Sequence, residues 1–129
     1  MALYLGSDRI DASSPIGNVE YVTPIVNSTY SHTTANAWVI TNLSFTVPEG
    51  HVYIVDVVCT YTNGKPYGIG LQNASTLSQG APVMSISETT AKYVTRGTFF
   101  VRPGTWYICT LRASTGSNTY NVYGLDFTI

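Results

Sequence analysis

The sequence contains few charged residues. Only 10% of its 129 residues are Asp, Glu, Lys or Arg, against about 25% in an average soluble protein. The six basic residues are scattered along the chain, and the formal net charge is −1. Proteins that bind nucleic acid or anionic membranes carry a concentrated basic surface, so we expect neither partner for this chain.

Long apolar runs are also missing. No stretch approaches the roughly 20 apolar residues that a membrane-spanning helix needs. The first residues lack the basic start and apolar core of a secretory signal, so the expectation is a chain made in the cytoplasm. No segment of ten or more residues has apolar residues at the spacing of a helix. The sequence therefore predicts an all-β protein.

Groups that carry catalysis or bind metals are scarce. Cys59 and Cys109 fall on strand faces that we expect to be buried, where a free thiol behaves as a small apolar side chain; a disulfide between them is the alternative. His32 and His51 stand alone, whereas a metal site needs several ligands at suitable spacing. No nucleophile, base and orienting group form a recognisable set. The prediction is a protein that is not an enzyme and needs no cofactor.

The clearest positive feature is an internal repeat with a constant offset of 54 residues and no gap. An even offset preserves side-chain parity, so equivalent residues are expected on the same face of equivalent strands. The matching pairs are Phe45 and Phe99, Val47 and Val101, Gly50 and Gly104, Tyr53 and Tyr107, Ile54 and Ile108, Gly70 and Gly124, and Leu71 and Leu125.

Each copy has the pattern strand, turn, strand, turn, strand, with apolar and polar residues alternating along the strands. This pattern predicts a two-sheet antiparallel sandwich of jelly-roll type. An immunoglobulin-like sandwich is the second choice, but the sequence lacks the Cys, Trp, Cys spacing of that fold. A lipocalin-like barrel fits the internal repeat less well than a sandwich does. We expect residues 1–35, with weak periodicity and two prolines, to form an extended N-terminal attachment arm and linker, and residues 36–129 to form the sandwich.

Apolar residues occupy several positions that the repeat assigns to an outward face in the second copy. A sandwich does not leave so much apolar surface in water, so we expect a homo-oligomer, most naturally a trimer. The expected interface residues are Val94, Phe100, Trp106 and Ile108.

The expected turns are rich in tyrosine and asparagine, whose aromatic faces and amide groups can capture sugars. Such residues are also ordinary in turns, which is the alternative interpretation. The residues expected to bind a glycan are Tyr61, Asn63, Tyr67, Asn118 and Tyr120.

The opening segment, Leu3-Tyr4-Leu5-Gly6-Ser7-Asp8-Arg9-Ile10, resembles the start of many small virion proteins of tailed bacteriophages and prophages. In those proteins a short Leu-Tyr-Leu-Gly-Ser/Asn-x-Lys/Arg-Ile segment precedes a β-rich domain, and lysine is usual where this chain has Arg9. The remainder is similar in style to the uncharged trimeric β-sandwiches of phage fibres and phage heads. This resemblance implies a virion structural protein, made in the host bacterial cytoplasm, whose N-terminal arm attaches to other virion proteins. We expect Leu3, Tyr4, Leu5 and Ile10 to make this attachment.

Three functions follow from these observations. The first is a phage fibre or receptor-binding tip that contacts host-surface polysaccharide. The second is a head fibre or capsid decoration protein with the same anatomy. The third, from a different class, is a free-standing bacterial lectin-like module.

Overall fold

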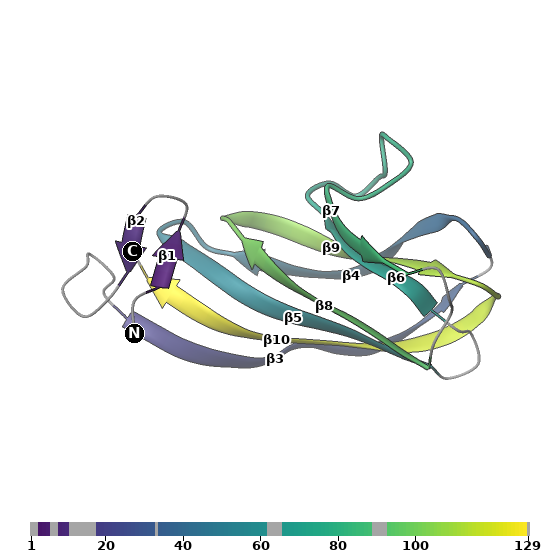
Figure 1. Cartoon of the computed structure of the whole chain (residues 1–129), viewed down its shortest axis with the longest axis horizontal. Helices are drawn as coiled ribbons and strands as arrows, with labels where there is room; N and C mark the ends of the chain where they lie inside the picture. The colour runs from purple at the N-terminus through teal and green to yellow at the C-terminus, as the bar shows by residue number, and fades with distance from the viewer. Residues whose placement is uncertain are drawn as a thin grey trace.

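The structure is a computed structural model that describes residues 3–5, 8–10, 18–32, 34–61, 66–88 and 93–128 (Figure 1). Every regular element in this part of the chain is a β-strand, so it holds no helix that could cross a membrane. The strands are β1 (Leu3–Leu5), β2 (Asp8–Ile10), β3 (Asn18–His32), β4 (Trp38–Val47), β5 (His51–Tyr61), β6 (Pro66–Gln72), β7 (Met84–Ser87), β8 (Val94–Val101), β9 (Gly104–Arg112) and β10 (Gly116–Thr128).

Eight strands form two antiparallel four-stranded sheets that pack face to face (Figure 1). The β3 sheet has the order β3-β10-β5-β8, and the β4 sheet has the order β4-β9-β6-β7. The pairs are nested, because β3 pairs with β10, β4 with β9, β5 with β8 and β6 with β7. This arrangement is that of a jelly roll. The predicted jelly-roll-like sandwich is therefore confirmed.

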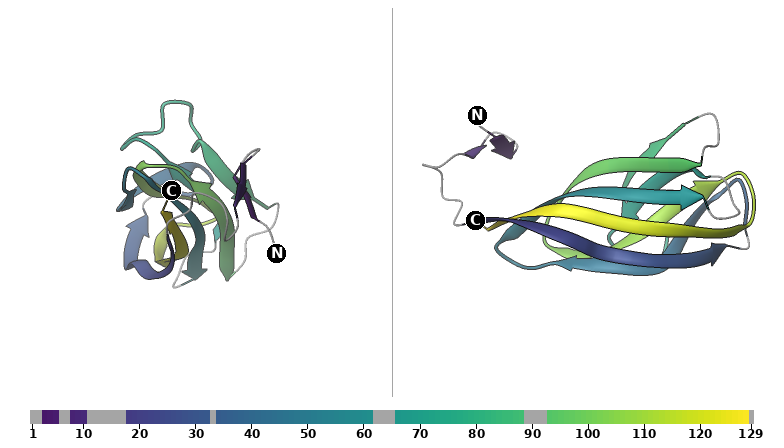
Figure 2. Two further views of the ribbon diagram at one scale, coloured as in Figure 1. Left: turned by 90° about the vertical axis from the view of Figure 1, so that its left-hand side faces the viewer. Right: turned by 90° about the horizontal axis from the view of Figure 1, so that it is seen from below.

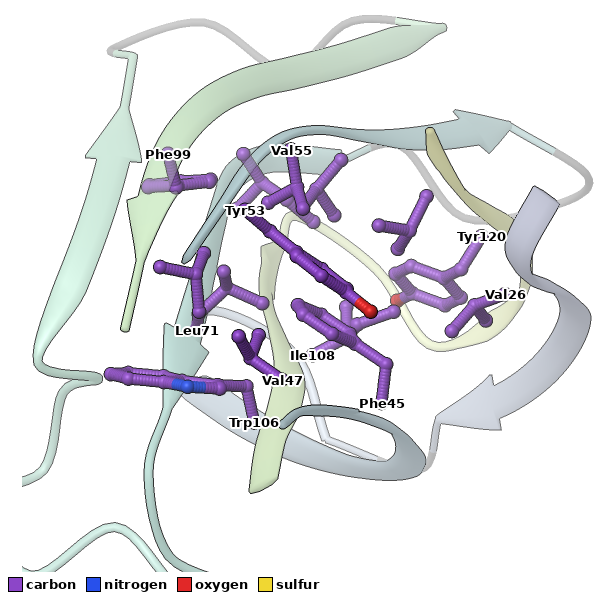
Figure 3. Packing of buried hydrophobic residues seen from close by; sticks show 14 of the residues in the cluster. Val26, Phe45, Val47, Tyr53, Val55, Leu71, Phe99, Trp106, Ile108 and Tyr120 are labelled. Atoms are coloured by element: carbon purple, nitrogen blue, oxygen red, sulfur yellow. The ribbon is translucent and has the colours of Figure 1, made fainter. Parts of the chain in front are cut away.

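The core lies between the two sheets and is built by alternate residues of each strand (Figure 3). Each fully buried valine or leucine contributes roughly 1.5–3 kcal/mol relative to an exposed one. Alternate residues of β4 and β5 are buried here: Phe45, Val47, Tyr53, Val55, Val57 and Cys59.

The predicted orientation is wrong in β9. Trp106 and Ile108, expected on an outward face, are buried in the core (Figure 3). Tyr107, between them, is partly exposed. The reason lies in the turns. Three residues, 48–50, separate β4 from β5, but only two, 102–103, separate β8 from β9. One residue fewer in the connection reverses the side-chain parity of the strand that follows.

The predicted boundary between arm and sandwich at residue 36 is also wrong. The whole of β3 pairs with β10, from Asn18 opposite Thr128 to His32 opposite Gly116, so the sandwich includes residues 18–32. Pro24 falls where the register between β3 and β10 shifts, on an edge strand, and there its missing N–H interrupts no regular ladder.

The sequence of the second half of β3 is rich in serine and threonine, which is why it was expected to be a linker. On its outer side Thr29 Oγ1 lies 3.2 Å from Thr119 Oγ1, and Ser31 Oγ lies 2.8 Å from Ser117 Oγ. These cross-strand hydrogen bonds hold residues 29–31 of β3 to β10 through hydroxyl groups.

The segment that resembles phage proteins forms a two-stranded sheet separate from the sandwich (Figure 2). In it β1 pairs antiparallel with β2, with Leu3 opposite Ile10, Tyr4 opposite Arg9 and Leu5 opposite Asp8. The attachment role of Leu3, Tyr4, Leu5 and Ile10 stays a prediction.

Candidate functional site

The outer face of the β3 sheet carries a row of apolar side chains across three adjacent strands. Ile54 on β5 pairs with Phe100 on β8 and with Leu125 on β10. Ile54 and Phe100 are partly exposed, and Leu125 is 38% exposed. We call these three residues the apolar row.

A second, mixed row lies beside it. Asp56 on β5 pairs with Thr98 on β8 and with Tyr123 on β10. Between the two rows the surface is hollowed by a volume of about 220 Å³, and the strands β5, β8 and β10 supply its walls. The side chains that line this hollow are Ile54, Asp56, Thr98, Tyr123 and Leu125.

Two arginines lie against the two rows. Arg96 donates to Asp56, with its Nη2 on Oδ2 and its Nε 3.4 Å from Oδ1, and this hydrogen bonding raises the pKa of the guanidinium. Arg102 lies over the ring of Phe100, with its guanidinium carbon 5.5 Å from the ring centroid. The result is an apolar floor with a hydroxyl, a phenol and a paired carboxylate at its side. This mixture suits contact with another protein surface or with a sugar.

Two of the four predicted interface residues lie on this face. Phe100 belongs to the apolar row, while Val94 is 44% exposed at the other end of β8. Six residues of strand, roughly 20 Å, separate the two. Trp106 and Ile108 are core residues and cannot form an interface. Since half of the predicted set is buried, the apolar surface left for an interface is smaller than the sequence indicated.

The predicted glycan-binding residues whose side chains are described, Tyr67, Asn118 and Tyr120, do not form one exposed site, although Asn118 pairs with Tyr61 across β10 and β5. Asn118 and Tyr120 are fully buried at the start of β10, which makes the expectation that they lie in an exposed turn wrong. Tyr67 is partly exposed and donates its hydroxyl to Asn36 Oδ1 at 3.3 Å. Tyr61 ends β5 with its side chain outside the described residues, and Asn63 lies outside them altogether.

Sequence reasoning missed Asp56, Tyr123 and Leu125 as one site. They are far apart in the chain, and only the pairing of β5 with β10 brings them together. The available signal was the nested strand order of a jelly roll, which places the last strand beside the third of its eight strands.

Elsewhere, the titratable groups that the structure describes form no metal site. Among the described residues, no three His, Cys, Asp or Glu side chains lie close enough to hold a metal ion. His51 Nδ1 lies 2.7 Å from Asp126 Oδ1, so this pair joins β5 to β10. Cys59 and Cys109 are free and buried, and burial raises their pKa values to about 11 and about 12. Both are neutral, weakly reactive thiols at pH 7.

A comparison with protein-family models finds no match to this chain, and a comparison with curated proteins finds none either.

Proposed function

We propose that this chain is a structural protein of a bacteriophage virion, of the fibre or receptor-binding type, that assembles as a homotrimer through the outer face of the β3 sheet. The observation that carries the proposal is the apolar row beside its hollow. Leu125, at the β10 end of this row, is 38% exposed, and the chain has little charge to keep such surfaces apart. A second copy of the chain is the partner that buries this row.

The phage assignment depends on the resemblance of residues 3–10. Because β1 and β2 form a sheet of their own, this segment can contact other virion proteins while the sandwich is displayed. A head fibre or capsid decoration protein has the same anatomy. Labelling the chain on intact particles and locating the label by electron microscopy separates head from tail.

The solution mass tests the assembly. Light scattering on the full chain is expected to give three times the mass of one chain, 14.0 kDa. The double variant Phe100→Ser, Leu125→Ser is expected to be a folded monomer. Val83→Ser is the matched control, because Val83 is 57% exposed outside both sheet faces and its loss should leave the trimer intact. A monomeric parent chain would contradict the proposal.

A lectin-like module is the second candidate, favoured by the lining of the hollow. Tyr123 offers an aromatic face, and Asp56 and Thr98 offer oxygens at its edge, which is a common way to hold a sugar ring. This function needs the hollow to be open to solvent, so it predicts a monomer.

Titration with bacterial cell-wall sugars separates the candidates. A lectin should bind at millimolar concentration or better and lose at least tenfold in affinity in Tyr123→Ala. The control Tyr107→Ala, which changes a partly exposed tyrosine of β9, should leave sugar binding unchanged. Removing residues 1–17 should abolish particle attachment of a virion protein but leave sugar binding by a lectin intact.

A further inference from the structure

One cation of this chain is buried between the sheets. Arg112 is the last residue of β9, and only 1% of its surface is exposed. None of Nε, Nη1 and Nη2 has a hydrogen-bond partner. A guanidinium stays protonated even where burial lowers its pKa, as it does here. Leaving such a charge without a counter-charge destabilises the folded state.

The surrounding core is polar but supplies no negative charge. Tyr120, Cys59 and Thr95 form an inward row across β10, β5 and β8. Cys59 Sγ lies 4.0 Å from Thr110 Oγ1 of the opposite sheet. Burial raises the pKa of the Cys59 thiol to about 11 and that of the Tyr120 phenol as well, so both groups are neutral at pH 7. In the same row, Thr95 Oγ1 is buried without a hydrogen-bond partner.

The carboxylates whose side chains the structure describes do not pair with Arg112. Asp56 is paired with Arg96 and Asp126 with His51, both away from Arg112. None of these carboxylates, nor those of Glu49 and Glu88, which are exposed, hydrogen-bonds with Arg112. None of these carboxylates therefore supplies a hydrogen-bonded counter-charge to Arg112.

We propose that Arg112 binds a small oxyanion, such as phosphate, sulfate or a carboxylate, enclosed between the two sheets at the end of β9. The guanidinium presents its N–H groups as a planar fork that matches two oxygens of such an anion. The Thr95 hydroxyl is a further donor in this layer of the core. The enclosure of Arg112 selects a small ion rather than a polymer. This site does not depend on the proposed function, because it lies in the core and not on the outer face of the β3 sheet.

Unfolding of the full chain measures the binding. Phosphate, sulfate and acetate are each titrated against chloride at matched ionic strength, and the midpoint of urea unfolding is recorded. A bound anion raises the midpoint with a saturating dependence on its concentration. General salting-out by phosphate or sulfate raises it without saturation. We expect saturation with at least one of the three anions.

The variant Arg112→Met removes the charge and keeps an unbranched apolar side chain. It is expected to weaken anion binding at least tenfold. Arg9→Met is the matched control, since Arg9 belongs to the separate β1–β2 sheet and its loss should leave the saturating shift unchanged. A midpoint shift in Arg112→Met equal to that of the parent chain would overturn the proposal.

A second measurement tests the proposal without the Arg112→Met variant, in case that variant does not fold. Line broadening of inorganic phosphate in 31P NMR reports binding to the parent chain and to Arg9→Met directly. Saturable broadening that sulfate or acetate reverses supports the site. If phosphate shows no saturable broadening with the folded parent chain, and none of the three anions gives a saturating shift of its unfolding midpoint, Arg112 has no anion and the proposal fails.

Discussion

Phe45 lies opposite Trp106 across the β4–β9 pair, and both side chains point into the core. The indole Nε1 of Trp106 also donates to the backbone oxygen of Arg102 at 2.9 Å. Trp106 therefore fixes the short turn between β8 and β9 to the centre of the sandwich, in a position where the internal repeat alone would have placed it outside.

Replacing Trp106 tests this assignment. Trp106→Ala should lower the free energy of unfolding by about 3–5 kcal/mol, because it leaves a large cavity and removes the hydrogen bond to Arg102. Urea unfolding followed by circular dichroism measures the loss. Phe100→Ala, which changes a residue on the outer face, is the comparison. In a monomeric chain it should lower the free energy of unfolding much less than Trp106→Ala does. Equal losses in the two variants would mean that Trp106 is not a core residue.

Gly70 permits the close approach of β7. A Cβ at this position would lie 2.5 Å from the backbone oxygen of Met84 and 2.5 Å from Pro82 Cγ. Gly70→Ala should therefore push β7 away, at a cost of about 1–3 kcal/mol. The same change at Gly50 meets no atom within 4 Å but forces alanine to a φ near +79°. Gly50→Ala should cost about 1–2 kcal/mol through backbone strain alone.

Proteolysis distinguishes the two glycine variants even if their stabilities are similar. Displacing β7 loosens the segment 73–83 that precedes it, so Gly70→Ala should be cut there faster than the parent chain. Gly50→Ala should be cut in this segment at the parent rate. Identical cleavage of both variants would contradict the packing role of Gly70.

The side chain of Gln72 hydrogen-bonds to two residues of the segment 73–83. Its Nε2 donates to the Thr76 oxygen at 3.1 Å, and its Oε1 accepts from the Val83 nitrogen at 2.9 Å. Gln72→Leu should cost about 1–3 kcal/mol, since it leaves backbone groups without partners. Hydrogen exchange at the Val83 amide should become faster in this variant. Gln79→Leu, an exposed change within the segment, should leave both quantities unchanged.

Stability should fall in alkaline solution. Burial raises the pKa of Cys59 from 9.0 to about 11 and that of Cys109 from 9.0 to about 12. Above pH 9 the unfolded chain therefore binds fewer protons than the folded chain, so the free energy of unfolding decreases as pH rises. The slope is about 1.4 kcal/mol per pH unit for each proton of difference. Below pH 9 these thiols cause no change.

Urea midpoints measured from pH 7 to pH 11 check this expectation. The double variant Cys59→Ala, Cys109→Ala should show a shallower decline between pH 9 and pH 11. A decline as steep as that of the parent chain would assign the effect to other groups, and the burial of the thiols would then be irrelevant to alkaline stability.

The all-β sandwich and most of its core could be predicted because alternation is a local property. Val55 and Val57 reveal their inward position within a few residues of sequence. The orientation of Trp106 depends instead on whether two or three residues connect two strands, and spacing within a repeat does not report that. β3 was missed because Pro24 and the hydroxyl residues are typical of linkers, while its strand state depends on pairing with β10.

The candidate site was harder to predict than the fold for a related reason. Asp56 and Tyr123 each look ordinary in the sequence, and only the register of two strands places them at one hollow. For Arg112, the residue type and the structure disagree. An arginine at the end of an expected strand suggests a solvated side chain, yet the even parity of β9 directs it between the sheets.

The nested order of the strands also governs how the chain can fold as it is synthesised. The innermost pair, β6 with β7, is complete early, but β3 must wait for β10, and Ser31 meets Ser117 only after 86 further residues have been made. Pairing over such separations is slow. Until β9 and β10 have been made, β4 and β5 lack their neighbouring strands and their apolar side chains are not covered. Folding of this domain on the ribosome is therefore expected to finish only after β10 has left the exit tunnel.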